Sequence, residues 1–179
     1  AWESYPDHLT EIVRAAVEEC DVYILTDDQS SVNSHLLSSG VDVTNVNYIN
    51  TPTNSVWIRD YGPNNVYTND VEDLLLVDWI YNRPRPDDDA APADIATALG
   101  VPLYETTQAP TDLVNTGGNF FSDGFGTGFA EELILEENEV GNSYGVTAKT
   151  EAEIDTIMKD FMGINRFIKF PVLPYDGIH

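Results

Sequence analysis

Hydrophobic residues recur along the chain at two spacings, and the change from one spacing to the other marks the expected elements. Apolar positions at 9–17 follow helical spacing and the apolar run at 22–26 comes soon after them, which indicates a helix and then a strand. A short helix at 29–39, ended by Gly40, and an extended run at 41–49 complete this opening. The opening part therefore predicts alternating helices and strands.

The middle of the chain predicts two neighbouring strands and a further helix. The strands are expected at 56–67 and 73–81, because the TNDVE segment between them is polar and rich in turn residues. The stretch at 82–94 has the composition of a loop, rich in proline and aspartate, which leads into a helix that ends at Gly100.

The second half repeats this pattern. Strands are expected at 101–105, 111–122, 129–136 and 164–173, and a helix at 151–162. The helices near positions 92 and 151 open similar αβ units about 60 residues apart, which favours repeated modules around an axis. No GxGxxG or GxxxxGK motif is present, so nothing predicts a nucleotide-binding βαβ unit.

The charge balance limits the partners that the chain can have. It holds 31 acidic and 8 basic residues, which give a net charge of −23 at neutral pH. Such a surface repels the phosphates of a nucleic acid, so no nucleic-acid partner is expected. Two interpretations of the acidity stay open: a solvated surface suited to a salty or extracellular setting, and steering of a cationic ligand.

Residues for metal, disulfide or membrane chemistry are few. The single cysteine, Cys20, excludes an internal disulfide framework and a CxxC metal site, and its place between a helix and a strand predicts a buried structural thiol. The histidines lack metal-ligand spacing, so no metal or cofactor is expected, although the many carboxylates leave an oxygen-ligand cation site open.

No apolar run approaches the ~18 residues of a membrane helix, so no membrane partner is expected. No leader sequence opens the chain at Ala1, so any signal peptide is expected to have been removed.

An arginine and an aspartate stand side by side in the apolar and aromatic stretch VWIRDYGP at 56–63. Side chains alternate along a strand, so Trp57 and Arg59 are expected on one face and Asp60 on the other. An inward carboxylate is costly unless a cation or hydrogen-bond donors meet it, and a planar guanidinium suits both of its oxygens. Two structural interpretations of Asp60 stay open: an internal pair with Arg59, and a cap of the Gly-Pro turn.

The stretch WIRDYGP resembles the W-x-R-D-x-G-P motif of the guanidino-group modifying enzymes, in particular the branch of bacterial peptidylarginine deiminases and agmatine deiminases. Three further stretches agree in order: IYNRPRPDDD, NTGGNFFSDGFGTGF and the terminal PYDGIH. The resemblance covers nearly the whole chain. It implies an α/β fold, a pseudo-fivefold α/β propeller (pentein) of ββαβ-type modules. Family enzymes are longer, so residues 1–179 are expected to be the N-terminal portion of a catalytic domain whose remaining modules are absent.

The resemblance also implies a reaction, the hydrolysis of a guanidinium to a ureido group with release of ammonia. A cysteine thiolate attacks the central carbon and forms a thiouronium intermediate, while carboxylates hold the nitrogens and a histidine transfers protons. Asp60 matches the first of these carboxylates, and Trp57 would form a wall of the slot for the side chain. His179 is either the family histidine or the residue just before it. The nucleophilic cysteine and the second carboxylate are absent from the chain, so a companion C-terminal fragment is expected.

Arg83 and Arg85 separate the branches of the family. The prolines of R-P-R-P stiffen the loop and are expected to hold both arginines on one side. There they would bind the carboxylate of a C-terminal arginine, as in the bacterial peptidylarginine deiminases. Agmatine has no carboxylate, and agmatine enzymes tend to carry E-G-G where this chain has T-G-G at 116–118. The alternative is that the two arginines neutralise the aspartates at 87–89, in surface pairs of little energy.

The glycine-rich stretch adds further candidates. Gly118 is placed among the substrate-binding residues, and it and Gly117 are expected to serve backbone conformation or close packing near the central channel. Asn119 and Asp123 either line the site or form turns, and turns are favoured.

Three hypotheses for function follow. The leading one is a secreted or periplasmic peptidylarginine deiminase that converts arginine in a peptide or protein, with C-terminal arginine preferred. The second is an agmatine deiminase. The third is a non-catalytic acidic module that binds cationic peptides without converting them.

Overall fold

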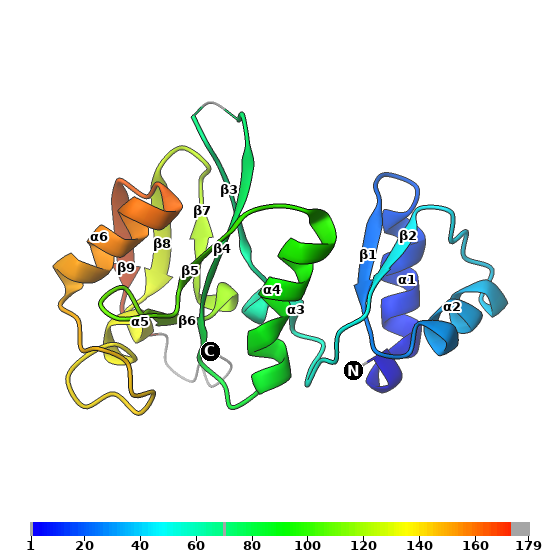
Figure 1. The fold of residues 1–179 in the computed structure, drawn as a ribbon, viewed down its shortest axis with the longest axis horizontal. Helices are drawn as coiled ribbons and strands as arrows, with labels where there is room; N and C mark the ends of the chain where they lie inside the picture. Colours follow the sequence, from blue (N-terminus) through cyan, green and yellow to red (C-terminus); the bar gives the residue numbers. More distant parts are fainter. Residues whose placement is uncertain (1, 70, 173–179) are drawn as a thin grey trace.

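A computed structural model describes residues 2–69 and 71–172 of the chain, which form three small sheets and the helices around them (Figure 1). The sheets follow one another along the longest dimension of the molecule. His179 and the rest of the PYDGIH stretch lie outside the described residues, so the prediction for that stretch cannot be placed on the fold.

The first sheet has two strands and lies with the opening helices of the chain. This part contains the 3-10 turn η1 (Trp2–Ser4), α1 (Pro6–Ala16), β1 (Val22–Leu25), α2 (Gln29–Ser38) and β2 (Val46–Ile49). The strands are parallel, with Val22 opposite Val46. Asp28 caps α2 by accepting a hydrogen bond from the Ser31 amide at 3.0 Å. Buried aliphatic residues of both helices, including Val13 and Leu36, pack against β1.

The next two sheets share one topology, ββαβ. The first ββαβ unit contains β3 (Asn64–Tyr67), β4 (Leu74–Tyr81), α4 (Pro86–Leu99) and β5 (Leu103–Thr106). The second contains β7 (Phe121–Ser122), β8 (Thr127–Glu131), α6 (Glu151–Met162) and β9 (Arg166–Phe170). In each unit the first two strands are antiparallel and the last is parallel to the second. The first strands begin at residues 64 and 121 and the last at 103 and 166, which confirms a repeat of about 60 residues.

Short elements introduce each unit. The helical turn α3 (Ile58–Tyr61) precedes β3, and the strand β6 (Val114–Asn115) with the 3-10 turn η2 (Gly117–Asn119) precedes β7. β6 pairs in parallel with the end of β4. A further helical turn, α5 (Leu133–Glu136), follows β8.

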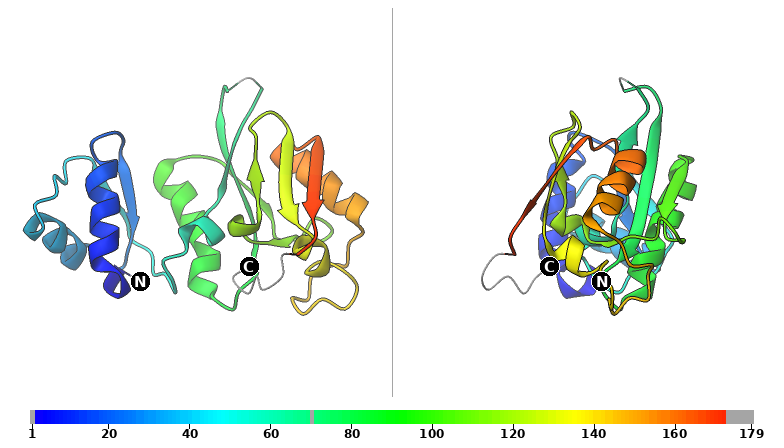
Figure 2. Two further views of the ribbon diagram at one scale, coloured as in Figure 1. Left: turned by 180° about the vertical axis from the view of Figure 1, so that it is seen from behind. Right: turned by 90° about the vertical axis from the view of Figure 1, so that its left-hand side faces the viewer.

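Helix α6 is covered on two sides. Its Ile154, Ile157 and Met158 belong to one core cluster with Trp79 of β4 and with Ala130 of β8. The edge-on view in Figure 2 shows α6 between the strands of the two units. Helix α4 likewise contacts β2 of the first sheet as well as β4 and β5 of its own unit. Each of these helices therefore packs against two sheets.

The expected strand at 56–67 is wrong over its first half. Residues 58–61 form the turn α3, and only 64–67 are a strand. Gly62 approaches the Ile58 carbonyl so closely that a Cβ there would lie 2.5 Å from its oxygen, which only a glycine allows. The expectation that Trp57 and Arg59 lie on one face of a strand and Asp60 on the other is therefore wrong too.

Other expected boundaries also shift. Helix α4 begins at Pro86 rather than after the aspartates, because proline suits the first position of a helix and acidic residues suit its first turn. The expected strands at 111–122 and 129–136 are interrupted by η2 and shortened by α5. The extended run at 41–49 is a strand only from Val46. The expected helix at 151–162 is confirmed, with a capping box between Thr150 and Glu153.

Cys20 is exposed, so its prediction as a buried thiol is wrong. Helix α1 ends at Ala16, and Cys20 follows on a surface turn whose amide donates to the Ala16 carbonyl at 2.9 Å. In the described part of the chain no helix is long and apolar enough to span a bilayer.

Candidate active site

Trp57 and Asp60 lie on one turn of helix. The Asp60 amide donates to the Trp57 carbonyl at 2.8 Å, and the Gly62 amide donates to the Ile58 carbonyl at 2.8 Å. Residues three apart on a helical turn are neighbours on its surface, so Asp60 lies closer to Trp57 than a strand would allow. The turn therefore brings the backbones of Trp57 and Asp60 together, while the Arg59 side chain bonds to the Phe120 carbonyl.

The Asp60 carboxylate is half-buried, and no group of the described residues donates a hydrogen bond to it. Neither internal interpretation of Asp60 fits this geometry, because Arg59 donates to the Phe120 carbonyl and no described amide of the Gly-Pro turn donates to the Asp60 carboxylate. The Trp57 indole is 51% exposed. A carboxylate without a donor beside an exposed indole can accept a planar cation.

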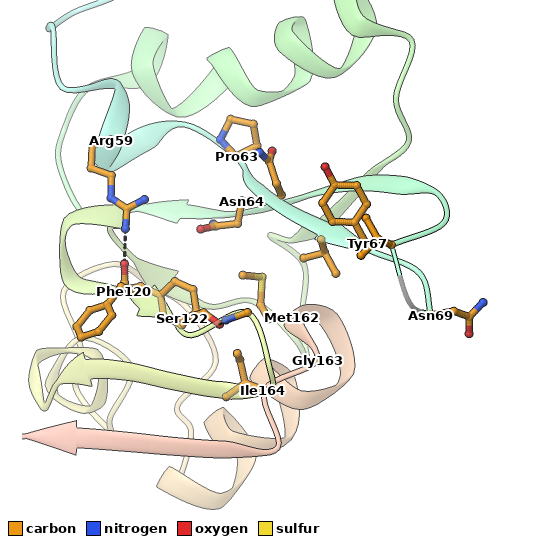
Figure 3. Close-up of a pocket in the computed structure, with 16 residues that line it drawn as sticks. Arg59, Pro63, Asn64, Tyr67, Asn69, Phe120, Ser122, Met162, Gly163 and Ile164 are labelled. Carbon is orange, nitrogen blue, oxygen red and sulfur yellow. Dashed lines mark hydrogen bonds between the residues drawn. The ribbon is translucent and has the colours of Figure 1, made fainter. Parts of the chain in front are cut away.

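Arg59 points to the opposite side, into a cleft of about 620 Å³ (Figure 3). Its Nη2 donates to the Phe120 carbonyl at 2.6 Å, which links α3 to the second ββαβ unit. The walls come from β3, from the segment at 120–126 and from the end of α6. Among the described residues that line this cleft, none carries a carboxylate, thiol or imidazole, so the Asp60 side of α3 is the better candidate for binding a guanidinium.

The segment at 116–118 packs directly on α3. A Cβ on Gly117 would lie 2.0 Å from the Arg59 carbonyl oxygen, and Thr116 Oγ1 donates to the Asp60 carbonyl at 3.4 Å. The expectation of close packing at Gly117 is confirmed. Gly118 follows in η2 and is partly exposed, so the structure brings it beside the turn that carries Asp60.

Tyr81, at the end of β4, contacts Arg85 and is close enough to Asp60 to feel its charge. Its hydroxyl accepts a hydrogen bond from Arg85 Nη1 at 3.1 Å, and the same nitrogen lies 3.3 Å from Ser55 Oγ. Burial raises the pKa of Tyr81, Arg85 opposes the rise and the Asp60 charge adds to it. Tyr81 thus contacts Arg85 directly and is within electrostatic reach of Asp60.

Arg83 turns toward a different group. Its Nη1 donates to the Asn82 carbonyl at 3.3 Å, and its charge lowers the pKa of both Glu137 and Tyr144. The expectation that the stiff loop holds both arginines on one side is wrong in this respect, since Arg85 contacts Tyr81 and Ser55 while Arg83 faces the loop after α5.

The three aspartates of the first turn of α4 hold the chain around them. Asp88, fully buried, accepts from the Asn54 amide at 2.7 Å and from the Ser55 amide and hydroxyl. Asp87 accepts from the Asn54 side chain, and Asp89 from the Tyr81 amide. These carboxylates thus fix the segment that leads into α3.

Asn119 and Asp123 have structural partners. Asp123 accepts from the amides of Phe125 and Thr127, and these bonds lower its pKa. Asn119 exchanges hydrogen bonds with the backbone of Glu131. The favoured turn-forming role is confirmed for Asp123, while Asn119 fastens η2 to β8.

Sequence reasoning missed Tyr81, Glu137 and Tyr144. Tyr81 stood within the IYNRPRP motif, but nothing in the letters placed Glu137 or Tyr144 near Arg83, because they come from a loop more than fifty residues away. Within the described ranges, no three His, Cys, Asp or Glu side chains gather as a metal site would require.

Comparisons with known proteins identify the family of this chain. The model of the Porphyromonas-type peptidyl-arginine deiminase family matches residues 2–175. The agmatine deiminase of Pseudomonas syringae is 28% identical over 138 residues, which cover 73% of this chain and 36% of that protein. The chain thus spans about a third of the length of the curated relatives that it matches.

Solved structures share the fold. The agmatine deiminase of Enterococcus faecalis superposes with a TM-score of 0.75 at 20% identity, over 95% of this chain and 46% of that one. The agmatine deiminase of C. jejuni gives 0.69 at 22% identity, over 95% and 48%. The expected pentein-type α/β fold is confirmed.

Proposed function

The chain belongs to the Porphyromonas-type peptidyl-arginine deiminase family, and we propose that it holds the guanidinium of a substrate arginine for hydrolysis to a ureido group. The observation that carries this proposal is the half-buried Asp60 carboxylate, which has no donor among the described residues and lies on one turn with Trp57. A guanidinium offers paired N–H groups to both carboxylate oxygens.

Asp60 would keep the guanidinium cationic and fixed in orientation. The central carbon accepts a thiolate only while the positive charge is retained, so a carboxylate on the nitrogens favours attack. Addition of the thiolate and loss of ammonia give a thiouronium, and water then releases the ureido product. The Trp57 indole adds a cation–π contact of ~1 kcal/mol.

The nucleophile and the proton-transferring histidine come from outside the described residues in this proposal. Cys20 lies exposed on the surface between α1 and β1, and His179 keeps its predicted role as the histidine or its neighbour. We propose that the segment works joined to the part of the relatives that it does not span.

Peptides that end in arginine are the proposed substrates. Arg85 contacts Tyr81, which is within electrostatic reach of Asp60, and within the described chain Nε and Nη2 of Arg85 have no acceptor, so they can bind a carboxylate. Agmatine carries no carboxylate. Agmatine deiminase activity is the second candidate, because relatives named for that activity match most of this chain.

The test uses the complete enzyme, this segment together with the remaining part of the deiminase. Asp60→Asn keeps the shape of the side chain and removes its charge, so we expect turnover to fall by about 10²- to 10³-fold while the fold is retained. Release of ammonia and citrulline is measured with a peptide ending in arginine, the same peptide with an amidated carboxyl group, and agmatine. Normal turnover by Asp60→Asn would contradict the site. Preference for agmatine over both peptides would select the second candidate.

A further inference from the structure

The sheet of the second ββαβ unit carries three phenylalanines on one face. Phe121 of β7 stacks on Phe129 of β8, with ring centroids 4.7 Å apart and ring planes 12° apart. Phe129 in turn stacks on Phe170 of β9, with centroids 6.2 Å apart and planes 5° apart. One aromatic ring from each strand therefore contributes to a row that crosses the whole sheet, called the phenylalanine row below.

The phenylalanine row lies on the face of the sheet opposite α6. Ala130 of β8 belongs to the core cluster around α6, and Lys169 of β9 pairs with Glu151 of that helix at 3.1 Å. Side chains alternate along a strand, so Phe129 and Phe170, the neighbours of these two residues, point to the other face. In the edge-on view of Figure 2, α6 lies on one side of β8 and β9. The row thus turns away from the helix of its own unit.

The phenylalanine row is open to solvent in the part of the chain that the structure describes. Phe121 is 56% exposed and Phe170 is 46% exposed, and Phe129 lies half-buried between them. Phenylalanine gains free energy on burial, and a contiguous apolar patch on a protein surface marks a place where another element binds. Rings that already stack on one another lose little conformational freedom when they are covered. We therefore expect a partner on this face.

The rest of the fold shows what covers such a face. The sheet of the first ββαβ unit contacts its own helix α4 and also α6 of the following unit, whose Ile157 and Met158 share a core cluster with Trp79 of β4. The two-stranded sheet before it likewise contacts α4, through β2. The helix of each unit thus packs against its own sheet and against the sheet that precedes it. By this rule, the sheet of the second unit is completed by a helix from a third unit.

We propose that the phenylalanine row is the docking surface for the helix of a third ββαβ unit, supplied by the part of the deiminase that this chain does not span. The chain covers 46% of the Enterococcus faecalis enzyme, so the remainder of such a relative is longer than one unit of about 60 residues. This inference rests on the part of the proposed function in which the segment works joined to that remainder. It is independent of the reaction at Asp60.

The chemistry of the docked helix follows from the helix that occupies the equivalent place. In α6 the aliphatic residues Ile154, Ile157 and Met158 stand at i, i+3 and i+4 and are buried. This spacing gives a helix one apolar stripe. The partner is therefore expected to be an amphipathic helix whose aliphatic stripe covers the three rings.

The test places Phe170→Ser in the complete enzyme and in the 179-residue chain. In the complete enzyme the change empties part of a buried contact, so we expect Tm to fall by about 5 °C. In the 179-residue chain the same ring is exposed, so Tm should change by less than about 2 °C. Phe125→Ser is the matched control, because Phe125 is 94% exposed on the loop after β7 and lies outside the row. It should leave both Tm values as in the parent.

A second measurement reports directly whether the face is covered. Phenylalanine labelled with fluorine at position 170 gives one NMR signal, and a soluble paramagnetic agent broadens the signals of exposed groups. The broadening should be several-fold weaker in the complete enzyme than in the 179-residue chain. Equal broadening in the two proteins would overturn the proposal.

Other occupants of the face give different results. If Phe170→Ser dissociates an oligomer of the complete enzyme in sedimentation, a second copy covers the row and the proposal is overturned. Equal Tm changes in the two proteins, whether large or absent, would also overturn it. Normal turnover by Asp60→Asn would remove the proposed site and leave the Tm difference intact, so the docking surface and the proposed function fail separately.

Discussion

The carbonyl oxygen of Arg59 lies against the α-carbon of Gly117 so closely that a Cβ there would stand 2.0 Å away. Contacts this short are not made by real side chains, and the atom in the way is backbone, which cannot rotate aside. The turn η2, which introduces the second ββαβ unit, therefore packs tightly against the turn that carries Asp60. The position of the candidate site depends on a glycine that takes no part in the chemistry.

Gly117→Ala should destabilise the chain by about 3 kcal/mol, because a methyl group forces α3 and η2 apart. Urea unfolding of the 179-residue chain measures the loss. Gly163→Ala is the control, since that glycine has a φ of +68° but nothing within 4 Å of its Cβ position. It should cost about 1 kcal/mol of backbone strain. Equal losses would mean that the close approach to Arg59 relaxes without cost.

Arg59→Gln should lower stability by about 1 kcal/mol, because it removes a charged hydrogen bond to the Phe120 carbonyl on an exposed side chain. The chemistry of the folded enzyme should be spared, since Arg59 faces the cleft rather than Asp60. Thermal unfolding and citrulline release are measured on the same preparation. A variant that is fully stable yet inactive would place Arg59 in the reaction.

Asp88→Asn should destabilise the chain by about 2 kcal/mol and reduce activity, because an amide replaces an acceptor of three donors from Asn54 and Ser55. Those donors begin the segment that leads into α3. Asp87→Asn is the matched change one residue earlier, at a less buried side chain, and should cost less. Similar losses in both variants would mean that the anchoring is not specific to Asp88.

Asp78→Asn should stabilise the chain at neutral pH. Burial, with the charges of Asp89 and Glu105, raises the pKa of Asp78 to about 8, while the unfolded chain holds it near 3.8. Folding is therefore not penalised below about pH 4, is penalised increasingly from pH 4 to 8, and carries a constant penalty above that. At pH 7 the variant should gain roughly 2 to 4 kcal/mol over the parent.

Urea unfolding between pH 4 and 9 checks the Asp78 prediction, since the gain of Asp78→Asn should shrink as pH falls toward 4. Asp123→Asn is a control of opposite sign. Hydrogen bonds to two backbone amides lower the pKa of Asp123, so its contribution is present above its unfolded pKa and is lost as pH falls. If the gain in stability of Asp78→Asn does not vary with pH, the buried charge of Asp78 is not its cause.

Local patterns predicted much of the fold. The helix at 151–162 was readable because Glu151 and Glu153 lie in its first turn, and the structure adds a capping box between Thr150 and Glu153. The repeat was readable from the spacing of helices alone. The turn α3 was not, because Trp57, Ile58 and Tyr61 are residues that strands favour, and only the packing of Gly62 and Gly117 bends them into a turn.

The candidate site was predictable in part. Trp57, Asp60, Arg83 and Arg85 stood in motifs, and the structure places Trp57 and Asp60 at α3 and Arg85 beyond the end of β4, while Arg83 faces the loop after α5. Glu137 and Tyr144 could not be placed, because a contact across more than fifty residues depends on how the second ββαβ unit packs against the first. His179 remains a prediction, since it lies outside the described residues.

The packing of α6 against both ββαβ units has a consequence for how the molecule unfolds. Ile157 and Met158 are buried among residues of both ββαβ units, so neither unit can lose its partner without exposing one side of that helix to water. Excision at the boundary between the units would leave two fragments that each expose an apolar layer. The repeats visible in the chain are therefore not separable modules, and their melting should be a single cooperative event.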